Sequence, residues 1–142
     1  WIVDKSRSDG LTADEVRGVL WRNRDADLTD IHMIDEIHAQ VYKPGPGEPY
    51  RAFRSSSDPV YMASEIGHAG FEKLLPELAQ RAQDGKWLLA DGLFAAAVRF
   101  HPYGDGNGRL ARVLYALAQI KADGPFFKAL TPEGESILNP RI

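Results

Sequence analysis

The sequence contains no cysteine in its 142 residues, which excludes disulfide bonds and thiolate metal sites. It also lacks an excess of positive charge. The formal net charge is −3, so no overall basic field favours binding to nucleic acid. No apolar run is long enough to cross a bilayer, because the best candidate, residues 87–100, carries Asp91 and Arg99. We therefore expect neither nucleic acid nor a membrane as a partner.

The remaining composition, 44% hydrophobic and 26% charged residues, is ordinary for a globular domain. The length predicts one domain over residues 1–142 with a single hydrophobic core. No signal peptide is visible, and the chain begins with Trp1 rather than Met, so we interpret it as a domain excised from a longer protein. The absence of cysteine fits a cytosolic enzyme and an exported protein equally well.

Apolar residues recur at helical spacing along most of the chain. Thr12 and Glu15 form a predicted capping box for a helix that ends near Arg22. A second helix is predicted to begin at Thr29 as its N-cap. His38 falls on the apolar stripe of that helix and is interpreted as a satisfied core histidine. Further helices are expected over about residues 71–82, 87–100 and 107–122.

The expected fold is all-α, a mainly helical bundle with one small β-hairpin. Pro76 lies inside the third predicted helix and is expected to start or kink part of it. Residues 87–100 are apolar nearly all round, which predicts a position at the centre of the fold. The only plausible β element spans residues 50–62, where short runs flank a Ser-Ser-Ser-Asp-Pro turn. This hairpin would form a flap.

The loop in HPYGDGNGRLAR, residues 101–112, carries the most specific chemical signal. It leads into a predicted helix, whose free N–H groups and positive dipole end make an anion site. Gly106 and Gly108 let a ligand approach the backbone closely, and Asn107 adds a side-chain amide donor. The loop is therefore predicted to bind an anion.

Four ionisable side chains complete this candidate site. Arg109 and Arg112 lie three residues apart on the predicted helix and can reach the same anion. Two guanidinium groups suit a polyphosphate better than a single carboxylate. Asp105 makes sense in such a cationic site if it holds a divalent ion, because Mg²⁺ typically takes one or two carboxylates plus phosphate oxygens. His101 is able to accept a proton near neutral pH.

Simpler interpretations of this loop explain less. A calcium loop is excluded because no bidentate glutamate follows at the required position. The GxxxxGK[ST] pattern of a P-loop is absent, and the glycines do not follow a predicted strand. Any single residue here would more often be structural than catalytic, but the whole ordered set is much harder to explain by a plain turn.

The ordered set resembles the signature of the Fic family, His-x-Phe-x-Asp/Glu-Gly-Asn-Gly-Arg-x-x-Arg, at every position except Tyr103, where Phe is usual. The resemblance covers roughly residues 29–122, because IDEIHAQVY and PYRAF look like the family's order of helix and flap. It implies a single Fic-like domain that transfers AMP from ATP to a Ser, Thr or Tyr hydroxyl of a target protein and releases pyrophosphate. Tyr103 is expected to anchor the loop in the core if its hydroxyl finds a partner.

The resemblance also implies a role for each motif residue. His101 would be the general base that takes the proton from the attacking hydroxyl. Asp105 would hold Mg²⁺ across the α- and β-phosphates. Arg109 and Arg112 would neutralise the charge of the outer phosphates. The anion-binding nest would consist of Gly106, Asn107 and Gly108.

In the flap, backbone groups would pair with an extended segment of the target protein, although a plain surface hairpin fits residues 50–62 about as well. The acceptor protein is the partner that this function requires, and the sequence leaves its identity and the oligomeric state open. The candidate docking residues are Arg51, Ala52, Phe53, Arg54, Val60 and Tyr61.

Two alternatives stay open from the sequence. One is Fic-type transfer of UMP, phosphocholine or phosphate, because selection of the base lies outside the motif. Gly108 favours nucleotidyl transfer over the kinase-like branch of the family. The other is a nucleotide-binding interaction module without activity, against which the intact His101 and Asp105 argue.

The segment Thr131–Ser136 matches poorly the inhibitory helix that restrains many Fic proteins, because Pro132 and Gly134 disfavour a helix there. Restraint would then come from an inhibitory partner or from a segment outside this sequence. The use of ATP implies a cytoplasmic location, either in the protein's own cell or in a host cell after secretion as a toxin or effector.

Overall fold

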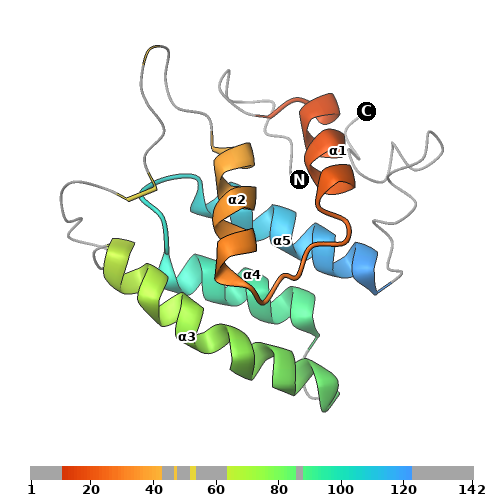
Figure 1. Cartoon of the computed structure of the whole chain (residues 1–142), viewed down its shortest axis with the longest axis vertical. Helices are drawn as coiled ribbons and strands as arrows, with labels where there is room; N and C mark the ends of the chain where they lie inside the picture. Colours follow the sequence, from red (N-terminus) through yellow and green to blue (C-terminus); the bar gives the residue numbers. More distant parts are fainter. Residues whose placement is uncertain (1–10, 43–46, 48–51, 54–63, 86–87, 123–142) are drawn as a thin grey trace.

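The computed structural model describes residues 11–42, 47, 52–53, 64–85 and 88–122, and within these residues it contains five α-helices and no strand (Figure 1). The all-α prediction is confirmed for this part of the chain. The helices are α1 (Ala13–Arg22), α2 (Ile31–Val41), α3 (Ser64–Gln83), α4 (Leu89–Phe100) and α5 (Asn107–Lys121).

The predicted β-hairpin is not seen. Ala52 and Phe53 are the described residues of this flap, and they lie in a bend rather than in a strand. The other four candidate docking residues lie outside the described part of the chain, as does the segment Thr131–Ser136; the four are Arg51, Arg54, Val60 and Tyr61.

Helix α5 occupies the centre of the fold. It packs along α4 and also contacts α1 and α2, while α3 covers the other side of α4 (Figure 1). The prediction that residues 87–100 form the centre is met in part, because α4 lies between α3 and α5 but leaves Val98 46% exposed. The buried residues of α5 are Asn107, Leu110, Ala111, Val113, Leu114, Ala116, Leu117, Ala118 and Ile120.

The starts of the first two helices illustrate local capping. The side chain of Thr12 accepts a hydrogen bond from the Glu15 N–H, and Glu15 returns one to the Thr12 N–H, so the predicted capping box is confirmed. Helix α2 is capped by Asp30 rather than by Thr29. The hydroxyl and N–H of Thr29 instead donate to the carboxylate of Asp27, and both bonds lower the pKa of Asp27.

Helix α3 is longer than expected. It begins at Ser64 and continues through Pro76, which is exposed, so the carbonyl that proline leaves unpaired can be hydrated. Near its start, Gly67 and Gly70 lie against the end of α4. A Cβ atom at Gly67 would overlap the carbonyl oxygen of Phe100, and one at Gly70 would lie 2.6 Å from the Phe100 ring. Glycine at these positions lets α3 approach the last residue of α4.

None of the described helices is both long and apolar enough to cross a membrane.

Candidate active site between α4 and α5

The loop between α4 and α5 is bounded by two residues in the left-handed conformation. His101 ends α4 with φ 51° and ψ 57°, and its N–H donates to the carbonyl of Ala97 at 3.1 Å. Gly106 is the N-cap of α5 with φ 77°. This conformation costs roughly 1–2 kcal/mol for a residue with a side chain, so the surrounding packing must hold His101 in place.

Asn107 closes the loop through its side chain. Its Oδ1 accepts a hydrogen bond from the Tyr103 N–H at 2.9 Å, and its Nδ2 donates to the Tyr103 carbonyl at 2.7 Å. The side chain is buried. The amide that we predicted as an anion donor is therefore used to fix the loop, and the donor that Asn107 offers at the start of α5 is its backbone N–H.

Helix α2 supports the far end of the loop through His38. This residue is fully buried, its ring stacks on Tyr103 with centroids 3.9 Å apart, and its Nε2 lies 2.8 Å from the carbonyl oxygen of Asp105. A carbonyl only accepts, so Nε2 carries the proton. Burial lowers the pKa of His38, an effect opposed by the Asp105 carbonyl and by the charges of Asp35 and Asp105. The interpretation as a satisfied core histidine is confirmed.

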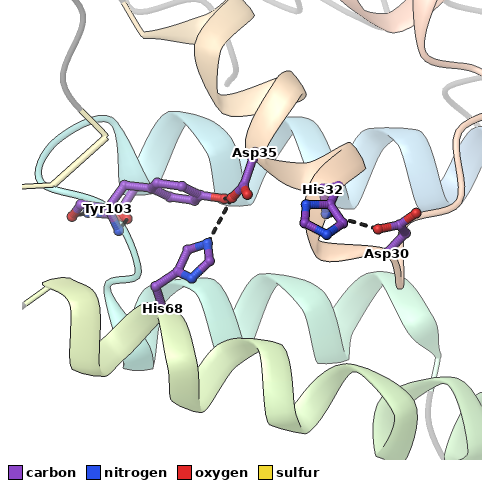
Figure 2. Close-up of polar contacts among 6 residues, drawn as sticks. Asp30, His32, Asp35, His68 and Tyr103 are labelled. Carbon is purple, nitrogen blue, oxygen red and sulfur yellow. Dashed lines mark hydrogen bonds and ion pairs between the residues drawn. The ribbon is translucent and has the colours of Figure 1, made fainter.

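Tyr103 anchors the loop in the core and its hydroxyl has a partner. The ring is 1% exposed, and the hydroxyl donates to Oδ1 of Asp35 at 2.5 Å. Nε2 of His68 on α3 lies 2.8 Å from the same oxygen (Figure 2). Our sequence reasoning did not identify Asp35 or His68. The available signal was the departure from Phe at position 103, since a buried tyrosine needs a hydrogen-bond acceptor.

The charged residues of the motif lie around the start of α5. Asp105 is exposed, and its Oδ1 accepts a hydrogen bond from the Gly106 N–H at 2.8 Å. Nη1 of Arg109 donates to the carbonyl of Val41 at the end of α2 at 2.8 Å. This bond uses one of the five N–H donors of the guanidinium group. Nη1 of Arg112 lies beside Gly108, where a Cβ atom would be 3.4 Å away.

The loop thus carries His101 at the C-cap of α4 and Asp105 directly before the N-cap of α5, and both arginines lie on the first turns of α5. Within the described part of the chain, no group of three or more His, Asp or Glu residues could hold a metal ion. Asp105, as a single exposed carboxylate, would fit Mg²⁺ if phosphate oxygens supplied its other ligands.

The two described flap residues contact the motif loop. The N–H of Gly104 donates to the carbonyl of Ala52 at 2.8 Å. The Phe53 ring meets His68 edge-on at 5.3 Å and lies parallel to Tyr103 at 6.5 Å between centroids. The chain near residue 52 is therefore attached to the candidate site itself.

Comparison with known proteins identifies one distant relative with a named activity. The chain is 30% identical over 146 aligned residues to the protein adenylyltransferase VopS of Vibrio parahaemolyticus. The match includes 98% of this chain and 35% of the relative, so the chain spans about a third of that protein's length. No protein-family model matches the chain, and no solved structure matches it significantly.

Proposed function

Because this chain is a distant homologue of a Fic-domain protein adenylyltransferase, we propose that it transfers AMP from ATP to a hydroxyl group of a target protein. The observation that carries the proposal is that one short loop holds His101, at the C-cap of α4, and Asp105, directly before the N-cap of α5. Such a transfer needs a base, a place for polyphosphate and positive charge for the leaving group.

In the proposed reaction, His101 takes the proton of the acceptor hydroxyl. The hydroxyl oxygen then forms a bond to the α-phosphorus of ATP, and the bond from that phosphorus to the bridging oxygen breaks. Pyrophosphate leaves with the bonding electrons. His101 is half-buried at the C-cap of α4, a position that is supported by α3 through the close approach at Gly67.

The phosphates are proposed to bind at the start of α5. Backbone N–H groups of the first turn, beginning at Asn107, donate to them. The exposed Gly108 leaves room for their approach, and the guanidinium groups of Arg109 and Arg112 offset the charge that develops on pyrophosphate. Asp105 would hold Mg²⁺, which supplies charge neutralisation for the α- and β-phosphates.

The target protein is proposed to dock beside the flap. Ala52 and Phe53 lie against the motif loop, so a target segment that bound beside them would lie next to this loop. Because the reaction consumes ATP, the proposal requires an ATP-containing compartment, the cytoplasm of the protein's own cell or that of a host cell.

The test uses a cell lysate as the source of target proteins, with added Mg²⁺ and ATP labelled either on the α- or on the γ-phosphate. We expect α-label but no γ-label on protein. His101→Ala should reduce incorporation by roughly 10²–10⁴-fold, whereas the matched control His32→Ala, at an exposed histidine of α2, should behave as wild type. Transfer of γ-label would indicate a kinase instead, and preferential use of labelled UTP, GTP or CTP would change the assigned group. Absence of any transfer would refute the proposal.

A further inference from the structure

A polar cluster behind the motif loop joins three parts of the chain that are distant in sequence. We call Asp35 on α2, His68 on α3 and Tyr103 in the loop the tyrosine lock. The carboxylate oxygen Oδ1 of Asp35 accepts the Tyr103 hydroxyl at 2.5 Å and lies 2.8 Å from His68 Nε2. Figure 2 shows the Asp35 carboxylate reaching toward both rings. One carboxylate therefore connects two helices to the loop.

The lock offsets the free-energy cost of burying a tyrosine hydroxyl at the position where the Fic signature has phenylalanine. A buried hydroxyl without a partner destabilises the folded state, and Tyr103 is only 1% exposed. A charged acceptor makes a stronger hydrogen bond than a neutral one. The Asp35 side chain is 40% exposed, so it keeps part of its hydration while it binds Tyr103 and His68.

The lock is linked to the proposed base by two short routes. Tyr103 lies two residues after His101, and its N–H and carbonyl are both fixed by Asn107. On α3, the residue before His68 is Gly67, which packs against the carbonyls of Phe100 and His101. The same turn of α3 therefore contacts the lock and the backbone of the base.

We infer that Asp35 is a positioning residue for transfer: its carboxylate holds the Tyr103 ring and the Gly67–His68 turn of α3 in register and thereby fixes the orientation of His101. The kinetic part of this inference rests on the proposed function. Besides the bonds between Asn107 and Tyr103, the start of α5 has two holds that do not involve Asp35, His38 at the Asp105 carbonyl and Arg109 at Val41. Loss of the lock should therefore disturb the base more than the phosphate site.

The kinetic test compares four variants with wild type by transfer of α-label at varied ATP. Asp35→Ala should lower kcat tenfold or more, equivalent to about 1.4 kcal/mol, with KM for ATP changed by less than about twofold, since misalignment of about 1 Å is enough to slow a reaction strongly. Asp35→Asn keeps a carbonyl acceptor and should recover most of kcat. Tyr103→Phe removes the hydroxyl that needs a partner, so in that background Asp35→Ala should cost less than about threefold.

The matched control is Asp30→Ala on the same helix. Asp30 caps α2 by accepting from the His32 N–H at 2.9 Å, at a distance from the lock that Figure 2 makes visible. Its loss should lower the melting temperature by roughly 2–4 °C but leave kcat unchanged. A wild-type kcat in Asp35→Ala, or an equal loss of kcat in both Tyr103 backgrounds, would overturn the inference.

A second measurement separates this inference from the proposed function. Amide hydrogen exchange of residues 101–108 without nucleotide should be faster in Asp35→Ala than in Asp30→Ala and wild type, because the loop has lost its anchor. If wild type transfers no nucleotide but this difference is found, the proposed function fails and the lock stands. Unchanged exchange in Asp35→Ala overturns the lock whatever the activity.

Discussion

Replacing Gly67 by alanine should destabilise the protein, although alanine is the better helix former. Gly67 lies inside α3, where the exchange would otherwise contribute about 1 kcal/mol of stability. Here the added Cβ would overlap the carbonyl oxygen of Phe100 and stand 3.2 Å from that of His101. Both contacts are backbone atoms, so α3 and the end of α4 must separate.

The expected size follows from these two opposed effects. Overpacking of a closely packed contact costs about 1–3 kcal/mol, occasionally more, and the backbone contact at Gly67 places it at the upper end. After the gain in helix propensity, we expect a net loss of about 1–2 kcal/mol, or a melting temperature lower by roughly 2–8 °C. The rate of transfer should also fall, by more than the loss of folded protein explains, because the displaced backbone carries His101.

Thermal and urea unfolding followed by circular dichroism measure this change, with Gly18→Ala as the matched control. Gly18 lies inside α1, and its added Cβ would meet only the flexible end of the Arg22 side chain at 3.3 Å. The control should therefore gain about 0.5–1 kcal/mol. If Gly67→Ala is as stable as Gly18→Ala, the close approach of α3 to α4 does not exist as described.

Three further predictions concern the motif loop and its support. Burial lowers the pKa of His38, so its stabilising effect is complete above about pH 6.5, the usual pKa of histidine. The free energy of unfolding should fall as the pH drops from there through the lowered pKa. Urea titrations at several pH values should show a weaker dependence of this free energy on pH in His38→Gln than in wild type. Asn107→Ala leaves two buried backbone groups of Tyr103 without their partners and should cost about 2–3 kcal/mol, with a smaller loss in Asn107→Asp, which keeps the acceptor. Arg112→Ala should weaken binding of ATP more than of AMP in calorimetry, and equal losses would remove Arg112 from the outer phosphates.

The helices that sequence periodicity predicted are those whose burial follows a regular apolar stripe, such as α2 and α5. The first turns of α3 were missed because SEIGHAG has no such stripe. Its two glycines disfavour a helix locally. Their role is seen only in the structure, where they allow the close contact of α3 with the end of α4. The burial of residues 87–100 was also overestimated, because α4 is apolar along most of its length but leaves Val98 46% exposed.

The residues of the candidate site that lie together in one stretch of sequence could be predicted. The motif residues from His101 to Arg112 are contiguous, and their order carried the resemblance to the Fic family, which distant homology confirms. Their supports are not contiguous. Tyr103 bonds to Asp35 and Arg109 bonds to Val41, and each pair is separated by 68 residues. The sequence around Asp35 or Val41 contains no pattern that predicts these contacts.

The hydrogen bond from Gly104 to the carbonyl of Ala52 has a consequence for how an acceptor residue would be chosen. It ties the backbone of Ala52 to the residue beside Asp105, so under the proposed function an extended target segment bound there would be positioned relative to His101 by main-chain atoms. Each step along a strand advances about 3.3 Å and turns the next side chain to the opposite face. A slip of one residue would therefore carry a hydroxyl out of reach of the base. Acceptor choice on this scaffold would be a matter of counting residues from the docking point rather than of recognising the side chain that is modified.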